Sequence, residues 1–369
     1  MRSKYTLIAA IIVIVLLAGL VVYPSIPNLT GTAIMINASG ASFPYPLFDG
    51  MITQYQNVQP HVQINYQPSG SGAGISALKN KTVEFAASDV PLSTSETDDT
   101  PQVLHIPETI GAITIVYNIN GVSSGLKLTG QVIADIFQGK ITTWNDAAIT
   151  SLNPNIALPA ANINTVYRSE GSGTTYVFTG YLSAASSSWH SNIGQGKSVS
   201  WPVGSGSRGN VGVTSFVKST TNSIGYVELT SALQGEMTVA AIQNPLGNFV
   251  MPTLESIATA AQVIASSGLP AGNECWSNVT LLNAKDPDAY PIVTFSYILV
   301  YKELNNIPNM TQERATALVQ FFWYVIHDGQ ELASDLYYVA LPSNVVELNV
   351  ATIQSITFNG QTLQTSTGE

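Results

Sequence analysis

The chain has few charged side chains for its length. Of its 369 residues, 13 are Lys or Arg and 23 are Asp or Glu, so only 10% are charged and the net charge is −10. A typical soluble domain has about 25% charged residues. An acidic chain with so few cations lacks the basic surface that binds nucleic acid, so we expect no nucleic-acid partner.

Cysteine and histidine are also scarce. Cys275 is the single cysteine, which excludes an intramolecular disulfide. The four histidines stand far apart without the spacing of metal ligands, so we expect no metal and no cofactor. The chain lacks the phosphate-loop sequence of nucleotide hydrolases and the serine elbow of α/β-hydrolases. A glycine pattern at residues 204–209 resembles a dinucleotide-binding sequence, but no strong strand precedes it. These absences argue against an enzyme.

The N-terminus carries a targeting signal. Arg2 and Lys4 precede an uninterrupted apolar run at residues 7–23. We predict that residues 1–25 form a membrane anchor, as an apolar helix, and that residues 26–37 form a linker. The alternative is a secretory signal that is removed by cleavage, and in either case the body of the protein lies outside the cell. Five sequons would permit glycosylation in a cell that performs it: Asn28, Asn37, Asn80, Asn278 and Asn309.

Two turns rich in glycine and hydroxyl groups stand about a hundred residues apart. One occupies residues 68–74 (Pro-Ser-Gly-Ser-Gly-Ala-Gly) and the other residues 168–175 (Arg-Ser-Glu-Gly-Ser-Gly-Thr-Thr). Each follows a predicted strand and precedes a predicted helix. A helix start presents unpaired N–H groups and the positive end of the helix dipole. Glycines let an anion approach those groups, so two such turns and one arginine could enclose a small oxyanion.

The order of predicted elements indicates an α/β fold. Strands are expected at residues 62–66, 83–87, 110–118, 164–167, 224–227 and 292–301, with helices between them. This order favours a parallel, doubly wound sheet in two domains. Ligands of such sheets bind beyond the carboxyl ends of strands, where Ser71, Asp89, Arg168 and Ser172 are expected.

Arg168 and Asp89 give the expected site its chemistry. The guanidinium of Arg168 can hold a tetrahedral oxyanion through parallel hydrogen bonds, and Glu170 would keep it in place. A carboxylate such as Asp89 repels anions unless the anion carries a proton that it can donate. Phosphate has that proton, whereas sulfate does not, so Asp89 would select phosphate. The alternative interpretations are a surface arginine paired with Glu170 and an aspartate that caps a helix.

Several sequence motifs, in order, resemble the PstS family, the phosphate-binding proteins of the phosphate ABC importer. These motifs are residues 40–44 (Gly-Ala-Ser-Phe-Pro), 66–74, 85–93, 168–174 (Arg-Ser-Glu-Gly-Ser-Gly-Thr), 209–213 and 224–228. The resemblance covers about residues 40–346. Ser42 stands where the family often has Thr, and the tail beyond residue 346 does not clearly resemble the family.

The resemblance implies a type II periplasmic-binding-protein fold of two lobes with two hinge crossovers, near Ile110 and Tyr290. Lobe I would comprise residues 38–110 plus 291–369, and lobe II residues 111–290. The implied phosphate-binding residues are Ser42, Phe43, Ser71, Asp89, Arg168, Ser172, Gly173 and Thr174, with Glu170 behind Arg168. The expected protein is a monomer that takes inorganic phosphate and passes it to ABC transporter permease subunits.

Three other functions stay open on the sequence. The ligand could be another tetrahedral oxyanion, such as sulfate, molybdate or arsenate. The protein could be a surface protein that keeps this fold without transport. It could also be a secreted phosphatase-like enzyme, although the sequence shows neither a metal cluster nor a positioned nucleophile and base.

Overall fold

The computed structural model describes residues 33–100, 102–266 and 268–365. The predicted anchor at residues 7–23 and its helix lie outside these residues. Within them, no helix has the length and apolar character that a bilayer crossing needs. The predicted linker ends too late, because residues 34–37 already form the start of a strand in which Ile34 and Ile36 are buried and Met35 and Asn37 are exposed. This alternation is that of a strand with one face on a core.

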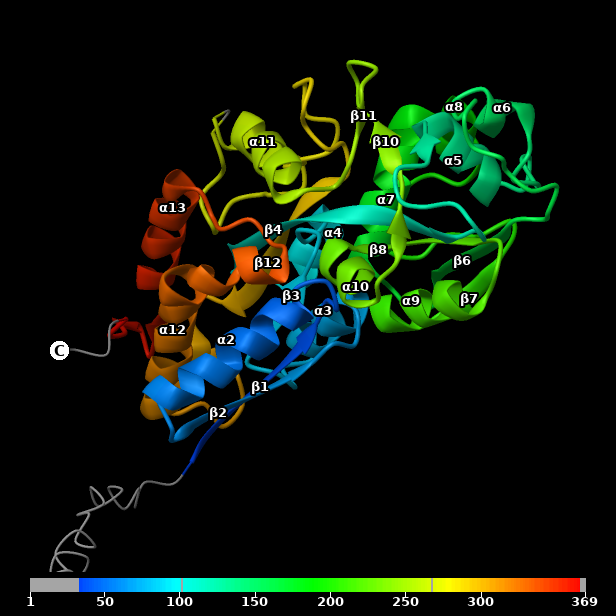
Figure 1. The fold of residues 1–369 in the computed structure, drawn as a ribbon. Helices are drawn as coiled ribbons and strands as arrows, with labels where there is room; N and C mark the ends of the chain where they lie inside the picture. Colours follow the sequence, from blue (N-terminus) through cyan, green and yellow to red (C-terminus); the bar gives the residue numbers. More distant parts are fainter. Residues whose placement is uncertain (1–32, 101, 267, 366–369) are drawn as a thin grey trace, which may run out of the picture. The chain divides into compact units, whose positions relative to one another are not determined.

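One large mixed sheet runs through the described body (Figure 1). Its strands, from one edge to the other, are β2 (Val62–Gln67), β1 (Ile34–Gly40), β3 (Phe85–Ser88), β12 (Val293–Tyr301), β4 (Val103–Asn118), β8 (Ser223–Glu228), β6 (Asn164–Arg168) and β7 (Ser205–Ser207). A short strand, β9 (Thr238–Val239), also pairs with β4. Two small sheets lie apart: β5 (Lys127–Leu128) with β10 (Ala241–Gln243) and β11 (Phe249–Val250), and β13 (Thr357–Phe358) with β14 (Gln361–Thr362).

The expectation of a parallel sheet is correct at the two ends of the sheet and wrong at its centre. β2, β1 and β3 are parallel, as are β8, β6 and β7. At the centre, β4 is antiparallel to both of its neighbours, β12 and β8, and β12 is also antiparallel to β3. The physical reason is the path of the chain, which runs outward along β4 and returns along β12 in the opposite direction.

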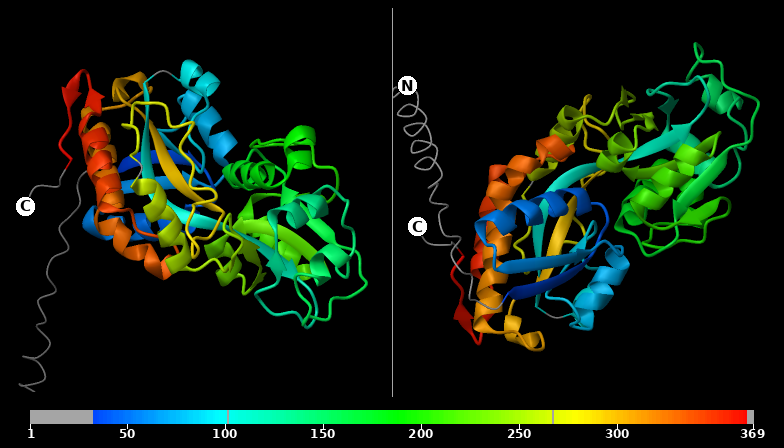
Figure 2. Two further views of the ribbon diagram at one scale, coloured as in Figure 1. Left: turned by 90° about the horizontal axis from the view of Figure 1, so that it is seen from above. Right: turned by 60° about the horizontal axis from the view of Figure 1, so that its bottom comes forward.

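Strand β4 belongs to both halves of the sheet. Its residues 103–112 pair with β12, and its residues 113–118 pair with β8. Fifteen of its sixteen residues are buried, which is typical of a strand covered on both faces. The two groups of elements that β4 joins are called here lobe I and lobe II, and Figure 2 shows them on either side of this strand.

Helices cover the sheet in each lobe. Those of lobe I are α2 (Tyr45–Val58), α3 (Ser71–Lys79), α4 (Thr94–Asp99), α12 (Gln312–Ile326) and α13 (Ser343–Gln354). Those of lobe II are α5 (Gly130–Phe137), α6 (Ala147–Thr150), α7 (Gly173–Ala185), α8 (Ser187–Asn192), α9 (Gly209–Ser219) and α10 (Leu229–Gln234). The aromatic run of α12 is core, as its residues Phe321 and Phe322 are fully buried. The tail, unassigned by the sequence, forms α13 and the β13–β14 hairpin.

The segment between β11 and β12 contacts lobe I. It contains α11 (Leu254–Ala265), which packs on β4 and β12. The N–H of His105 in β4 donates to the carbonyl oxygen of Gly272 at 2.8 Å, and Trp276 stacks on the His105 ring. The lobe limits near residues 110 and 290 stay predictions.

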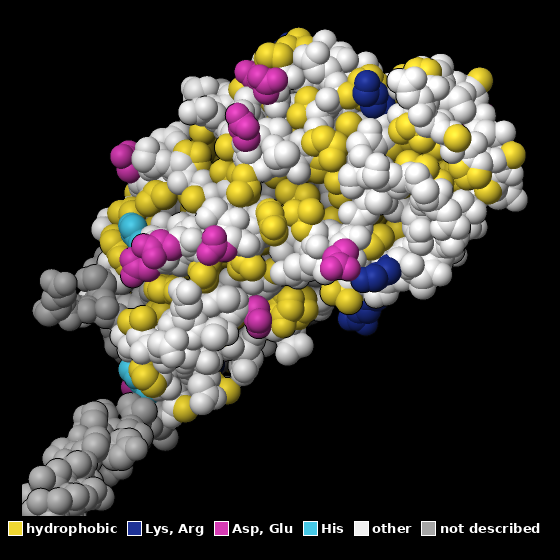
Figure 3. Space-filling view, viewed as in Figure 1, with side chains coloured by type: hydrophobic (Ala, Val, Ile, Leu, Met, Phe, Trp, Pro, Cys, Tyr) yellow, Lys and Arg dark blue, Asp and Glu magenta, His cyan; other side chains and the backbone are white. Residues whose placement is uncertain are grey.

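The low content of charged residues is visible on the surface of the described body. On the face drawn in Figure 3, most atoms belong to uncharged groups, and the charged side chains are scattered instead of forming one patch. On this face, charge is therefore carried by isolated side chains.

Candidate functional site

The carboxyl ends of strands from both lobes point to one place. In lobe I, β1 leads to Ser42, β2 to α3, and β3 to Asp89. In lobe II, β6 ends at Arg168 and leads to α7, and β7 leads to α9. The starts of α3, α7 and α9 thus face the same region, where first-turn N–H groups of each helix already donate to groups of the site. The expected position beyond the strand ends is the observed one.

Arg168 links the two lobes through its side chain, which is almost fully buried. Its Nη2 donates to the Ser42 hydroxyl of lobe I at 3.1 Å. Within lobe II, its Nη1 donates to Asn210 Oδ1 at 2.8 Å and to Thr174 Oγ1 at 3.2 Å. Its Nε donates to Glu170 Oε1 at 2.7 Å, and Nη2 contacts the same oxygen. The guanidinium is therefore held in one orientation from several sides.

Asp89 is also buried and lies among hydroxyl groups. Thr174 donates to its Oδ2 at 3.3 Å, and Ser296 donates to its Oδ1 at 3.4 Å. Its own N–H donates to the Ser71 hydroxyl at 3.3 Å. Thr174 comes from α7 of lobe II, so the carboxyl, like the guanidinium, contacts both lobes.

The ionisation of Asp89 is strongly affected by its surroundings. Burial raises the pKa of Asp89 to about 7, against the opposing effects of the Arg168 guanidinium and of hydrogen bonds from Thr174 and Ser296. The acid therefore exchanges its proton near neutral pH, where phosphate does so as well. Buried acids with such shifts are frequent at functional sites.

The two glycine turns contact each other across the lobes. The N–H of Gly173 donates to the Ser71 hydroxyl at 3.2 Å, and the N–H of Gly72 donates to the Gly171 carbonyl at 3.0 Å. A Cβ on Gly173 would lie 2.5 Å from Ser71 Oγ and 2.7 Å from Asp89 Oδ2. Gly70 has a φ of 100°, which side chains rarely adopt. Glycine is thus required where the turns meet.

The other predicted residues have clear local roles. Ser172 is the N-cap of α7, and its hydroxyl accepts from the Thr175 N–H at 3.1 Å while keeping its own proton to donate. Glu170 accepts from the N–H of Gly209 at 3.1 Å as well as from Arg168. Phe43 is buried, with its ring edge-on to Tyr338 and its carbonyl accepting from the Tyr338 hydroxyl at 2.5 Å.

Several residues of this region were missed by the sequence reasoning. Asn210, which holds Arg168, follows the glycine pattern that we set aside, and its position at the start of α9 was the signal available. Ser296 comes from β12, far along the chain, and has no local signature. Two more acids, Glu108 and Glu228, are buried in the sheet. Burial raises the pKa of Glu228 to about 7 and that of Glu108 well above its usual range.

A pocket of about 340 Å³ borders Asp89. Lobe I lines it with Asp89, Pro91 and Thr294, and lobe II lines it with Tyr176 and Gly180. The pocket therefore lies between residues of both lobes beside Asp89, and residues 277–283 also line it.

Comparison with known proteins places this architecture in a family. Residues 27–328 match the model of the PBP superfamily domain. The phosphate-binding protein PstS of Xylella fastidiosa (strain Temecula1) is 42% identical over 321 residues, which cover 85% of this chain and 84% of the relative. The phosphate-binding protein PstS of Pasteurella multocida is 40% identical over 321 residues, covering 86% and 90% of the two chains.

The fold agrees with solved structures of such proteins. A phosphate-binding protein from Stenotrophomonas maltophilia superposes with a TM-score of 0.64 at 18% identity, covering 87% of this chain and 94% of that one. The two-lobe arrangement is thus that of the periplasmic-binding-protein fold. With its strand-end site, its buried arginine and acid, and relatives of this identity along most of its length, the chain belongs to the PstS family of phosphate-binding proteins.

Proposed function

We propose that this protein captures inorganic phosphate between its lobes for uptake by an ABC transporter. The observation that carries the proposal is the buried carboxyl of Asp89, which lies among hydrogen-bond donors and near a buried arginine. Donors alone would suit any tetrahedral oxyanion. One acceptor among them suits an anion that still carries a proton.

The proposed contacts follow from the chemistry of each group. Arg168 and the N–H groups of Phe43 and Gly173 would donate to the phosphate oxygens. Hydroxyl groups at the helix starts would donate to the same oxygens; they are Ser42, Ser71, Ser172 and Thr174. Asp89 would accept the proton of the phosphate, which removes the repulsion between the two anions. Glu170 would stay on Arg168 and fix its orientation.

Asp89 separates the alternative ligands into two groups. Sulfate and molybdate carry no proton near neutral pH, so an ionised Asp89 would face them as an unpaired buried charge. Arsenate has the same protonation chemistry as phosphate, so Asp89 gives no discrimination against it. Rejection of arsenate would have to come from the size of the closed site.

The protein would act outside the cell as a monomer that delivers phosphate to permease subunits. Residues 38–110 with 291–369, and residues 111–290, would move against each other about crossovers near 110 and 290. Phosphate would favour the closed arrangement because it binds groups of both lobes at once. The N-terminal segment would anchor the protein in the membrane, with cleavage as the alternative. The family is one of binding proteins, not enzymes.

Calorimetric titration of the full chain tests the ligand. We expect one phosphate per chain, bound tightly, with no heat from sulfate at about pH 8, where an Asp89 with a pKa near 7 is ionised. Folded protein that takes no phosphate would contradict the proposal. Phosphate uptake by cells with and without the gene separates a transport protein from a surface protein that only binds phosphate.

A further inference from the structure

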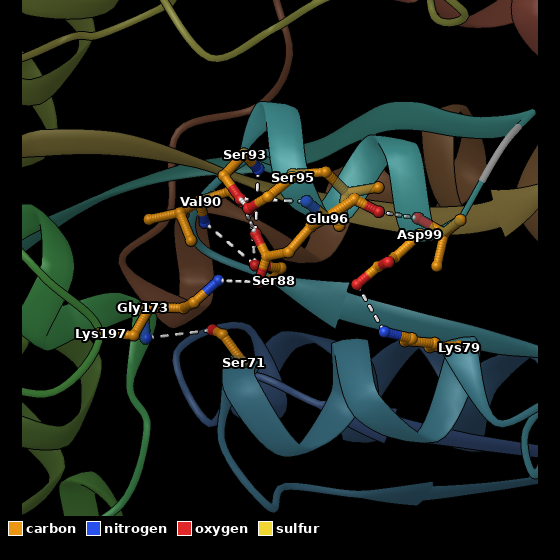
Figure 4. Close-up of polar contacts among 12 residues, drawn as sticks. Ser71, Lys79, Ser88, Val90, Ser93, Ser95, Glu96, Asp99, Gly173 and Lys197 are labelled. Atoms are coloured by element: carbon orange, nitrogen blue, oxygen red, sulfur yellow. Dashed lines mark hydrogen bonds and ion pairs between the residues drawn. The ribbon is translucent and has the colours of Figure 1, made fainter.

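We propose that an ion pair between Lys197 and Glu96, outside the ligand site, sets the affinity for phosphate by holding the lobes together. This inference rests on the proposed function for its ligand, but not for its structural part. The ammonium of Lys197 contacts Glu96 Oε1. Lys197 lies between α8 and β7 of lobe II, and Glu96 lies on α4 of lobe I (Figure 4).

Among the ion pairs between residues that the structure describes, this pair alone joins the lobes. Two pairs lie within lobe I, between Lys79 and Asp99 and between Arg314 and Glu84. Two lie within lobe II, between Lys140 and Asp135 and between Arg168 and Glu170. Arg168 also reaches across the lobe boundary, but to the Ser42 hydroxyl and not to an acid.

Contacts with Ser93 hold the Glu96 side chain in place independently of Lys197. It completes a capping box at the start of α4, where its Oε2 accepts from the Ser93 N–H at 2.9 Å and from the Ser93 hydroxyl at 2.8 Å. Its other oxygen, Oε1, is left for Lys197. A carboxylate that is already fixed loses little side-chain freedom when the pair forms.

Because the pair is only partly exposed to solvent, we expect it to be stronger than an ordinary surface ion pair. The side chains of Lys197 and Glu96 are 23% and 25% exposed, whereas those of Lys79 and Asp99 are 48% and 57% exposed. Water screens the more exposed pair more strongly. Partial burial raises the pKa of Glu96. The interactions with Lys197 and with the Ser93 N–H lower this pKa by more than burial raises it, so the pKa of Glu96 lies below its usual range and the carboxyl stays ionised.

Both partners are connected to the proposed phosphate contacts by short paths. The carbonyl of Lys197 accepts from the N–H of Ser172, the N-cap of α7, at 2.9 Å. On the other side, Ser93 follows Asp89 after three residues. The pair therefore forms only when the start of α7 and the Asp89 turn are close, which is the arrangement in which both could contact one ligand.

The test is a double-mutant cycle with Lys197→Gln, Glu96→Gln and both changes together. Gln at position 96 keeps the capping box, and Gln at 197 keeps the backbone contact with Ser172. We expect each single variant to bind phosphate about 5-fold more weakly, through faster release, and the double variant to be no weaker than either. Lys79→Gln, which breaks an ion pair inside lobe I to another residue of α4, is the matched control and leaves the dissociation constant unchanged.

Three outcomes would overturn the inference. If Lys197 instead attracts the anion from a distance, Lys197→Gln slows association, and Glu96→Gln strengthens binding because a nearby negative charge is gone. Single effects that add in the double variant would show that the two residues act independently. Equal dissociation constants for all variants would mean that the pair contributes nothing.

A measurement without phosphate keeps this inference separate from the proposed function. Small-angle scattering of the ligand-free full chain should give a larger radius of gyration for Lys197→Gln and Glu96→Gln than for the wild type and Lys79→Gln. If the wild type binds no phosphate but this difference appears, the proposed function is wrong and the role of the pair stands. An unchanged radius in the Lys197 and Glu96 variants contradicts the pair as a contact that holds the lobes.

Discussion

Arg168 and Asp89, opposite charges that enter the site from different lobes, meet at one hydroxyl group. Thr174 Oγ1 accepts from Arg168 Nη1 at 3.2 Å and donates to Asp89 Oδ2 at 3.3 Å. The Thr174 hydroxyl thus bridges the guanidinium and the carboxyl, which form no direct ion pair with each other. A ligand that accepts from the guanidinium and donates to the carboxyl would replace contacts that these groups make with Ser42 and Thr174.

Replacing Arg168 by Lys should remove most of the phosphate affinity. An ammonium cannot reproduce the fork that contacts Ser42, Thr174 and Asn210 together, so we expect binding at least about 100-fold weaker by calorimetry. Arg208→Lys is the control, because Arg208 is exposed next to Gly209. Unchanged affinity in Arg168→Lys would show that the charge of Arg168, not the geometry of its guanidinium, matters.

Gly173→Ala tests whether the lobes must meet at the glycine turns. The added methyl would lie 2.5 Å from Ser71 Oγ and 2.7 Å from Asp89 Oδ2 in the arrangement described here. Crowding of this kind costs about 1–3 kcal/mol, so phosphate binding should weaken about 5- to 150-fold. The thermal unfolding temperature of the ligand-free protein should not fall, since alanine is a good helix former.

Gly212→Ala is the matched control for the previous variant. Gly212 also lies in the first turns of a lobe II helix, but a Cβ there would be 3.5 Å from Ser207, which is ordinary contact. Its phosphate affinity should equal that of the wild type. A similar loss in both variants would mean that any alanine in these helix starts disturbs binding, and the contact between the lobes would not be the cause.

Glu228 should make the ligand-free protein less stable as the pH rises. Burial raises the pKa of this carboxyl from 4.5 to about 7, against hydrogen bonds from Ser231. A raised pKa means that the fold favours the neutral acid, so this contribution to stability is complete below about pH 4.5 and is lost as the pH rises through about 7.

Glu228→Gln keeps a neutral group that can still cap α10. Urea unfolding at about pH 8 should show a free energy of unfolding about 1–3 kcal/mol higher than that of the wild type, with no gain at about pH 4. The comparison is made without phosphate, so that ligand binding does not enter. A gain that is the same at both pH values would point to packing instead of ionisation.

The sequence predicts where β3 and β6 end better than it predicts the direction of the central strands. The two glycine turns and the ends of β3 and β6 are local features, and they appear where expected. The start of β4 was placed too late, at residue 110, because Pro107 interrupts the strand pattern. The structure accommodates it at a bulge, where the register shifts between Ser296 and Tyr297 and Glu108 has no partner residue on β12.

What could not be predicted are the contacts between distant segments. The helix start at Asn210 marks that residue as a candidate but does not indicate its contact with Arg168, and nothing near Ser296 indicates that it donates to Asp89. Lys197 and Glu96 each look like ordinary surface residues, although Ser93 and Glu96 have the spacing of a capping box. These pairings depend on how the strands order themselves in the sheet, which local patterns do not encode.

The central claim is that Asp89 selects an anion that carries a proton. Competition between phosphate and sulfate, measured at about pH 8.5 and about pH 5 for the wild type and Asp89→Asn, tests it most directly. With a pKa of about 7, Asp89 is ionised at the higher pH and neutral at the lower one. We predict strong preference for phosphate at pH 8.5 in the wild type, a weaker preference at pH 5, and little preference in Asp89→Asn at either pH. A wild-type preference that is unchanged between the two pH values, or is retained by Asp89→Asn, would contradict the account.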